Sequence, residues 1–164
     1  MIGPRHETDR GMSIALTHVL TIGITTILIA MLLMSGSTML ETETERSAQT
    51  SLETVGERLA GEIDNVDQIA NESSDRVTLT AEHPRSVANS QYTVALKEDC
   101  SEVDASLLDD STTCLRLTAQ DIDVTVYVPV AVDGDQIKEP PQSVQGGTIE
   151  IRYEGDGVEL EAVN

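Results

Sequence analysis

The fold is decided by a stretch near the start of the chain, which reads DRGMSIALTHVLTIGITTILIAMLL from residue 9 to residue 33. Its only charges lie at its first two positions, and no charged residue follows until Glu41. A secretory signal has an apolar core of about 7–15 residues, whereas a bilayer-spanning helix needs about 20. The run over residues 12–34 therefore predicts a spanning helix, with a signal cut at the small residues 35–37 as the alternative.

The bases beside this run predict its orientation in a membrane. Arg5 and Arg10 precede the run, whereas Arg46 is the base that follows it most closely. Lys and Arg near the ends of a span favour the cytoplasmic side. We therefore expect a single-pass protein in contact with membrane lipid, with its N-terminus in the cytoplasm and its C-terminal part outside the cell.

Hydroxyl side chains recur along one sector of the predicted span. Ser13, Thr17, Thr21 and Thr25 lie four residues apart, so they share a helix face. Such hydroxyls bond either across a contact between two membrane helices or back to their own helix. The sequence leaves both possibilities open.

Acidic residues dominate the rest of the chain. There are 29 Asp and Glu against 10 Lys and Arg, and the charges before residue 12 cancel, so the whole net charge of −19 lies beyond residue 40. Such a surface repels phosphate, which excludes nucleic acid as a partner. Two explanations remain: adaptation to high salt, where about 1 M salt shortens the Debye length to roughly 3 Å, or a surface for cations or a basic partner. The even spread of the acids favours salt adaptation.

A second helical pattern follows the charge-free run without a break. Its apolar residues recur every three or four positions and predict one helix that continues from the span to about residue 70. Gly56 and Gly61 each weaken such a helix by roughly 1 kcal/mol relative to Ala, so packing must support it. The stripe consists of Ala48, Leu52, Val55, Leu59, Ile63, Val66 and Ala70.

Beyond Asn71 the apolar period changes from about 3.6 residues to two, which indicates antiparallel strands with one buried face. Glu154-Gly155-Asp156-Gly157 predicts a tight hairpin, and residues 132–147 predict a long loop. The helical stripe is the expected cover for the apolar face of the sheet. The alternating segments are 77–81, 92–96, 115–117, 122–130, 149–153 and 158–162.

The predicted fold class is therefore α+β, with a long N-terminal helix packed on a small antiparallel β-sheet domain. Four segments follow from it. They are a hydrophilic leader over residues 1–11, a transmembrane or assembly helix over 12–40, an extracellular continuation of the helix over 41–71, and an antiparallel β domain over 72–164.

Two candidate sites lie in the part expected outside the cell. Cys100 and Cys114 predict a disulfide that closes a loop of about 15 residues, with free thiols or a metal pair as alternatives. No nearby His or Cys completes a four-ligand site, so we expect no metal. Asn71-Glu72-Ser73 is a candidate N-glycosylation site.

Catalytic motifs are missing from the sequence. His83 stands before Pro84 and Arg85 without a nucleophile motif such as G-x-S-x-G. The chain also has no phosphate loop and no dinucleotide fingerprint. We therefore expect neither an enzyme nor a cofactor.

The leader resembles a known processing signal. Asp-Arg-Gly-Met-Ser at residues 9–13, followed by a long uncharged run, resembles the class III signal sequence of archaeal type IV pilin-like proteins, and the acidity resembles their halophilic versions. The resemblance implies that a prepilin peptidase recognises Arg10, cuts after Gly11 and leaves Met12 as the mature N-terminus.

The resemblance also implies a function. We expect a pilin-like structural subunit of a cell-surface type IV filament or pseudopilus for adhesion or secretion, which binds like or related pilin subunits through its N-terminal helix. The alternative is a single-pass, membrane-anchored extracellular binding module that does not polymerise. Whether the Gly11–Met12 bond is cut distinguishes the two.

Overall fold

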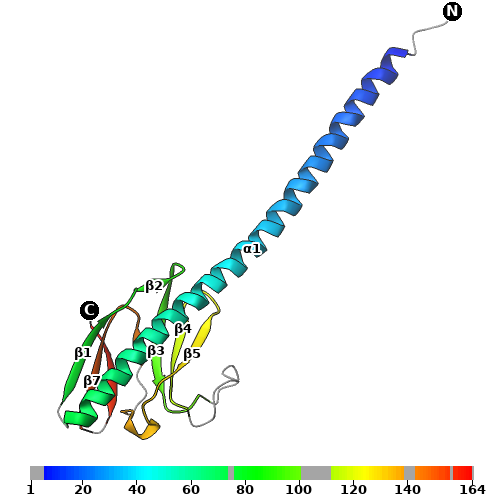
Figure 1. Ribbon diagram of the computed structural model, residues 1–164. Helices are drawn as coiled ribbons and strands as arrows, with labels where there is room; N and C mark the ends of the chain where they lie inside the picture. Colours follow the sequence, from blue (N-terminus) through cyan, green and yellow to red (C-terminus); the bar gives the residue numbers. More distant parts are fainter. Residues whose placement is uncertain (1–5, 74–75, 101–111, 139–142, 156, 164) are drawn as a thin grey trace, which may run out of the picture. The chain divides into compact units, whose positions relative to one another are not determined.

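The computed structural model describes residues 6–73, 76–100, 112–138, 143–155 and 157–163, with side chains from residue 14 onward apart from that of Thr38 (Figure 1). The chain divides into two compact units, Met1–Glu43 and Thr44–Asn164. Each unit is described by itself below.

The described part of the first unit is helical and belongs to α1 (His6–Ser73). Every large hydrophobic side chain described between Ile14 and Leu40 is more than half exposed. By length and composition this segment meets the requirements of a membrane span, with a mean hydropathy of 2.2. An apolar surface of this size is unfavourable in water and favourable in lipid or against other helices.

The second unit contains the rest of α1, and here the helix is amphipathic. The predicted stripe is buried throughout, from Ala48 to Ala70, with Leu52, Leu59 and Ile63 fully inaccessible. The polar positions between them face solvent or lie at the border of the core. The 3.6-residue period of the sequence therefore identified the buried face correctly.

The helix ends three residues beyond the stripe. Ser73 Oγ donates to the carbonyl oxygen of Ile69 over 2.8 Å, and the Asn71 amide donates to Asp67 Oδ2 over 3.0 Å. Hydrogen bonds between residues four apart stabilise a helix. These two bonds therefore extend α1 to Ser73, beyond the helix end predicted at about residue 70.

The β domain consists of two antiparallel sheets. The first has three strands in the order β1-β7-β8, and the second has five, in which β6 pairs with β3 beside the path β2-β3-β4-β5. A short 3₁₀ helix, η1 (Gly134–Gln136), lies between β5 and β6. The strands are β1 (Val77–Glu82), β2 (Ser86–Val87), β3 (Ser90–Lys97), β4 (Cys114–Ala119), β5 (Thr125–Pro129), β6 (Ser143–Gln145), β7 (Thr148–Tyr153) and β8 (Val158–Ala162).

One hydrophobic core joins the helical stripe to both sheets. Leu59 of α1, Leu117 of β4 and Ile151 of β7 all belong to it, and each is fully buried. This arrangement confirms the predicted α+β fold, in which a helix covers the apolar faces of the strands. The core is aliphatic apart from one fully buried tyrosine, Tyr92, and the half-buried Tyr153 at its edge.

Tyr92 shows how closely this core is packed. Its hydroxyl donates to the carbonyl oxygen of Pro84 over 2.7 Å, and burial raises its pKa to about 12. A Cβ at Gly146 would lie 2.3 Å from the ring, so glycine alone fits there. The buried phenol therefore keeps a hydrogen-bond partner, as buried polar groups require.

The structure differs from the sequence-based prediction of the strands at three points. The predicted strand 122–130 begins at Thr125, because the Asp121 amide bonds to Ser90 Oγ and the chain turns before that strand. The predicted loop 132–147 contains η1 and β6. Finally, the expected single sheet is two sheets. The predicted hairpin is present, with the Glu154 amide bonded to Gly157 O over 3.2 Å.

Candidate functional site

The candidate processing site lies within α1. Arg10, Gly11 and Met12 have helical backbone, and their side chains are outside the described set. A peptidase that cut after Gly11 would therefore act on a bond in the second turn of α1, which would have to open locally. Cleavage at this bond stays a prediction.

Behind this bond, the surface of the span is apolar on all sides. Thr21 Oγ donates to Thr17 O over 2.8 Å, and Thr25 Oγ donates to Thr21 O over 2.7 Å. These two hydroxyls thus bond back to their own helix, which is one of the two arrangements that the sequence allowed. Because the donors are satisfied inside the helix, what they present outward is mainly methyl and methylene surface.

Two glycines interrupt that surface without contacting anything. A Cβ built at Gly23 or Gly36 would have no neighbour within 4 Å. Small residues let the backbones of two membrane helices approach closely. The first half of α1 therefore offers an apolar, hydrogen-bond-satisfied face on which another helix can pack.

The two cysteines are joined, as the sequence predicted. Cys100 and Cys114 form a disulfide with a Cα–Cα distance of 6.1 Å, and both residues are buried. Cys114 is the first residue of β4, so the bond ties Cys100, which follows β3, to the start of this strand. Residues 101–111, which lie between the two cysteines in the chain, are outside the described residues.

The candidate glycosylation site occupies the last turn of α1. Asn71 is exposed, but its amide nitrogen is bonded to Asp67. Attachment of a glycan would replace this hydrogen bond. Occupancy of the site stays a prediction.

His83 is a residue whose role sequence reasoning missed. It directly follows β1, and its side chain is 1% exposed, with its Nε2 3.0 Å from Glu62 Oε2 on α1. Its Nδ1 is buried without a partner among the described residues. The sequence does indicate that His83 is buried, because it continues the alternation of Val77, Leu79 and Ala81 toward the buried face.

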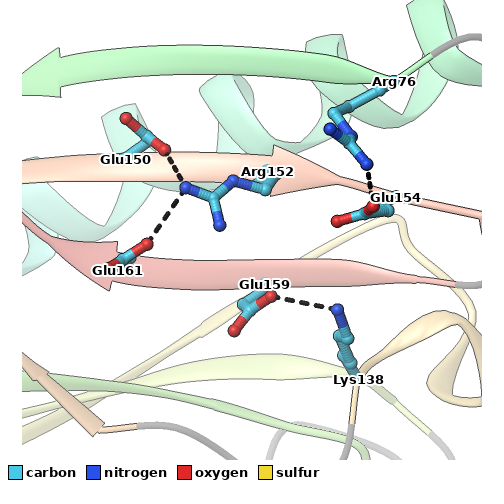
Figure 2. Close-up of polar contacts among 7 residues, drawn as sticks. All are labelled: Arg76, Lys138, Glu150, Arg152, Glu154, Glu159 and Glu161. Atoms are coloured by element: carbon cyan, nitrogen blue, oxygen red, sulfur yellow. Dashed lines mark hydrogen bonds and ion pairs between the residues drawn. The ribbon is translucent and has the colours of Figure 1, made fainter.

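Several ion pairs lie on or beside the outer face of the three-stranded sheet (Figure 2). Arg152 lies between Glu150 and Glu161, and its hydrogen bond to Glu150 raises its pKa above the usual value. Lys138 pairs with Glu159 over 3.2 Å, and Arg76 pairs with Glu154. Exposed pairs of this kind contribute little to stability, because solvent screens them. This face is a solvated, acidic surface in which bases bridge neighbouring acids.

Within the described part of the chain, no group of three His, Cys, Asp or Glu side chains is placed to hold a metal ion. One hollow of about 300 Å³ lies beside α1, and none of its lining residues is titratable. These residues are Thr50, Ser51, Thr54, Val55, Pro84, Ser86 and Val87.

Comparison with known proteins gives one match. Neither the curated proteins nor the solved structures that were compared match this chain. The sequence model of DUF7266, described as a family of unknown function, matches residues 7–163. The match runs from the leader through the apolar helix to the last strand, so it covers both units. The chain therefore belongs to the family DUF7266.

Proposed function

We propose that the chain is a pilin-like structural subunit of an archaeal cell-surface type IV filament or pseudopilus. The observation that carries the proposal is the contrast along α1: a charge-free, fully solvent-facing apolar half is followed by an amphipathic half whose stripe is buried under two sheets. A helix of the first kind is stable in lipid and equally stable in a bundle of like helices. Subunits with such a helix can pass from the membrane into a filament without exposing apolar surface to water.

Three further features support the proposal. The Arg10-Gly11-Met12 stretch stands directly before the apolar half, where prepilin peptidase would act. The DUF7266 match treats the helix and the β domain as one unit of sequence. The disulfide suits an oxidising, external location for the second unit. Together they support a single-pass protein with a cytoplasmic N-terminus, whose partners are lipid, the peptidase and like or related subunits.

The acidic surface fits a halophilic setting. The net charge of −19 lies entirely outside the membrane half. At high salt its self-repulsion is screened, while the carboxylates keep the surface hydrated. The proposal assigns the β domain a structural and adhesive role, without catalysis and without a cofactor.

The proposal is tested by the fate of the Gly11–Met12 bond in cells that contain the peptidase. Gly11→Leu places a bulky side chain at the cut, so we expect this variant to stay full length and to be missing from filaments. Gly36→Leu is the matched control: it makes the same change in the same helix, at a position with free space, and should be processed normally. If the wild type also stays full length and monomeric, the chain is an anchored binding module instead.

A further inference from the structure

The outer edge of β1 is an open strand edge in the described part of the β domain. β1 is the terminal strand of the order β1-β7-β8, and Figure 1 shows it at the border of its sheet. Its central residues Thr78, Leu79 and Thr80 are all exposed, and Leu79 keeps 36% of its surface accessible although it lies on the apolar face. An open edge presents unpaired backbone donors and acceptors to another strand.

The register identifies which backbone groups are open. The His83 amide bonds to Gly147 O, which places the odd-numbered residues of β1 in hydrogen-bonded pairs with β7. The Val163 amide bonds to Thr148 O, so the backbone N–H and C=O groups of the even-numbered residues of β7 point toward β8. Those of the odd-numbered residues therefore point toward β1, which agrees with the pairing above. In an antiparallel ladder the alternate residues face away. The N–H and C=O groups of Thr78, Thr80 and Glu82 therefore point to the open edge.

The edge also lacks the usual devices that prevent pairing. Between Val77 and Ala81 there is no charge, no proline and no bulge, although natural edge strands commonly carry one of these. Charges stand only at the two ends, Arg76 before the strand and Glu82 at its last position. Both residues are exposed.

We propose that β1 is a self-complementary docking edge, through which two copies of this chain pair their β domains antiparallel about Leu79. In this register Leu79 faces its own counterpart, Val77 faces Ala81 and Thr78 faces Thr80. Arg76 of each copy then faces Glu82 of the other. Every open backbone group is paired, and the apolar faces of the two sheets join on the same side.

Charge complementarity selects this register. Arg76, just before β1, already contacts Glu154, which directly follows β7, as Figure 2 shows. Glu82 has no ion-pair partner within the described part of the chain. Pairing about Leu79 supplies one and places Arg76 between two glutamates. A shift by one position about Thr80 would instead bring Glu82 opposite Thr78 and leave both end charges unpaired.

This contact differs from assembly through the N-terminal helix. A two-fold contact uses the same patch on both copies and closes on itself, so it joins β domains in pairs and does not by itself propagate a filament. Failure of the contact would leave the proposed pilin function untouched.

The first test introduces a cysteine into the full-length, detergent-solubilised protein, whose native cysteines are already paired. Directly opposed residues in a non-hydrogen-bonded antiparallel pair have Cα atoms about 4.5 Å apart, within disulfide range. Leu79→Cys should therefore give a disulfide-linked dimer under mild oxidation, in at least about fivefold excess over Ile69→Cys and Val163→Cys. These control positions are more exposed than Leu79 but lie away from the edge. Equal cross-linking at all three positions, or none at Leu79→Cys, would overturn the proposal.

The second test uses the charges at the ends of the strand, with Leu79→Cys cross-linking as the readout. Arg76→Glu and Glu82→Arg should each lower dimer yield by about tenfold, because opposite charges become like charges twice per contact. Mixing the two single variants should restore a mixed dimer, and the double variant should restore its own. Glu154→Gln, which removes only the internal partner of Arg76, should leave the yield unchanged. Loss of dimer without rescue by mixing would contradict the register.

Discussion

The two halves of α1 have the same secondary structure and opposite surfaces. Between Ile14 and Leu40 the helix shows large apolar side chains on every side, whereas from Ala48 to Ala70 it buries one stripe and exposes polar positions. The first half has no partner in the described chain, and the second half has two sheets. We propose that the partner of the first half is lipid or the helices of other subunits, because apolar side chains of this size are unfavourable in water.

The largest effect is expected from a cavity under the second half. Leu59→Ala removes a fully buried side chain from the core between helix and sheets, which should destabilise the β domain by about 2–5 kcal/mol. Leu28→Ala makes the same change in the first half, where the side chain is exposed, and should leave the domain unaffected. Urea unfolding followed by tyrosine fluorescence measures both. Equal losses of unfolding free energy in the two variants would contradict the difference between the two halves of α1.

A charge in the first half should have the converse effect. Ile27→Arg places a charge near the middle of the apolar segment, which should cost about 2.5–3.5 kcal/mol in membrane insertion. The unfolding midpoint of the β domain should not change. Carbonate extraction of membranes measures insertion, and Glu57→Arg, on the exposed face of the second half, is the control that should remain inserted. Unchanged insertion of Ile27→Arg would contradict the membrane role.

Two glycines of the second half should respond in opposite directions. A Cβ at Gly56 would lie 2.6 Å from Val128 Cγ2, so Gly56→Ala should destabilise the domain by about 1–3 kcal/mol. A Cβ at Gly61 meets nothing within 4 Å, so Gly61→Ala should stabilise the helix by up to about 1 kcal/mol. Paired thermal unfolding curves measure the difference. Two changes of the same sign would show that the helix does not pack on the sheet at Gly56.

The smallest effect concerns Asp67, whose Oδ1 is buried without a hydrogen-bond partner. Burial raises its pKa, the bond from Asn71 lowers it, and Asp133 and Asp64 raise it, with a net rise. A carboxyl with a raised folded-state pKa destabilises the fold when ionised, and this penalty disappears as the pH falls through that pKa. Asp67→Asn should therefore stabilise the domain by roughly 0.5 kcal/mol at neutral pH, and the gain should vanish in acid.

Stability curves of Asp67→Asn and wild type between neutral and acidic pH test this sign. Glu57→Gln is the matched control, because it neutralises an exposed carboxylate on the same helix. A gain for Asp67→Asn that grows as the pH falls would contradict the burial of the charge.

Most of the fold followed from the period of apolar residues. Long patterns such as the helical stripe and the alternation in β7 are repeated often enough to fix both the element and its buried face. The sequence did not predict β6 because this strand has only three residues. Val144 is its one apolar position, and a single flanking residue on each side is too few to show a period of two. Its place depends on the open side of β3, which is a tertiary property.

The sites were harder to predict than the fold. Two cysteines in an external domain predict their own pairing, and the structure contains it. The alternation of β1 indicates that His83 is buried, but its contact with Glu62, which is 21 residues away in the chain, is revealed only by the three-dimensional packing. Processing at Arg10 and Gly11 stays a prediction, because recognition by a peptidase depends on side-chain chemistry that a helical backbone does not report.

The central claim is that a peptidase removes the leader before Met12 and that the apolar half of α1 is then used for assembly. The intact mass of the protein isolated from native membranes tests this claim most directly. The account predicts a chain that begins at Met12 and retains the whole apolar helix. A chain that retains residues 1–11 would contradict it, as would one that begins after the small residues at 35–37.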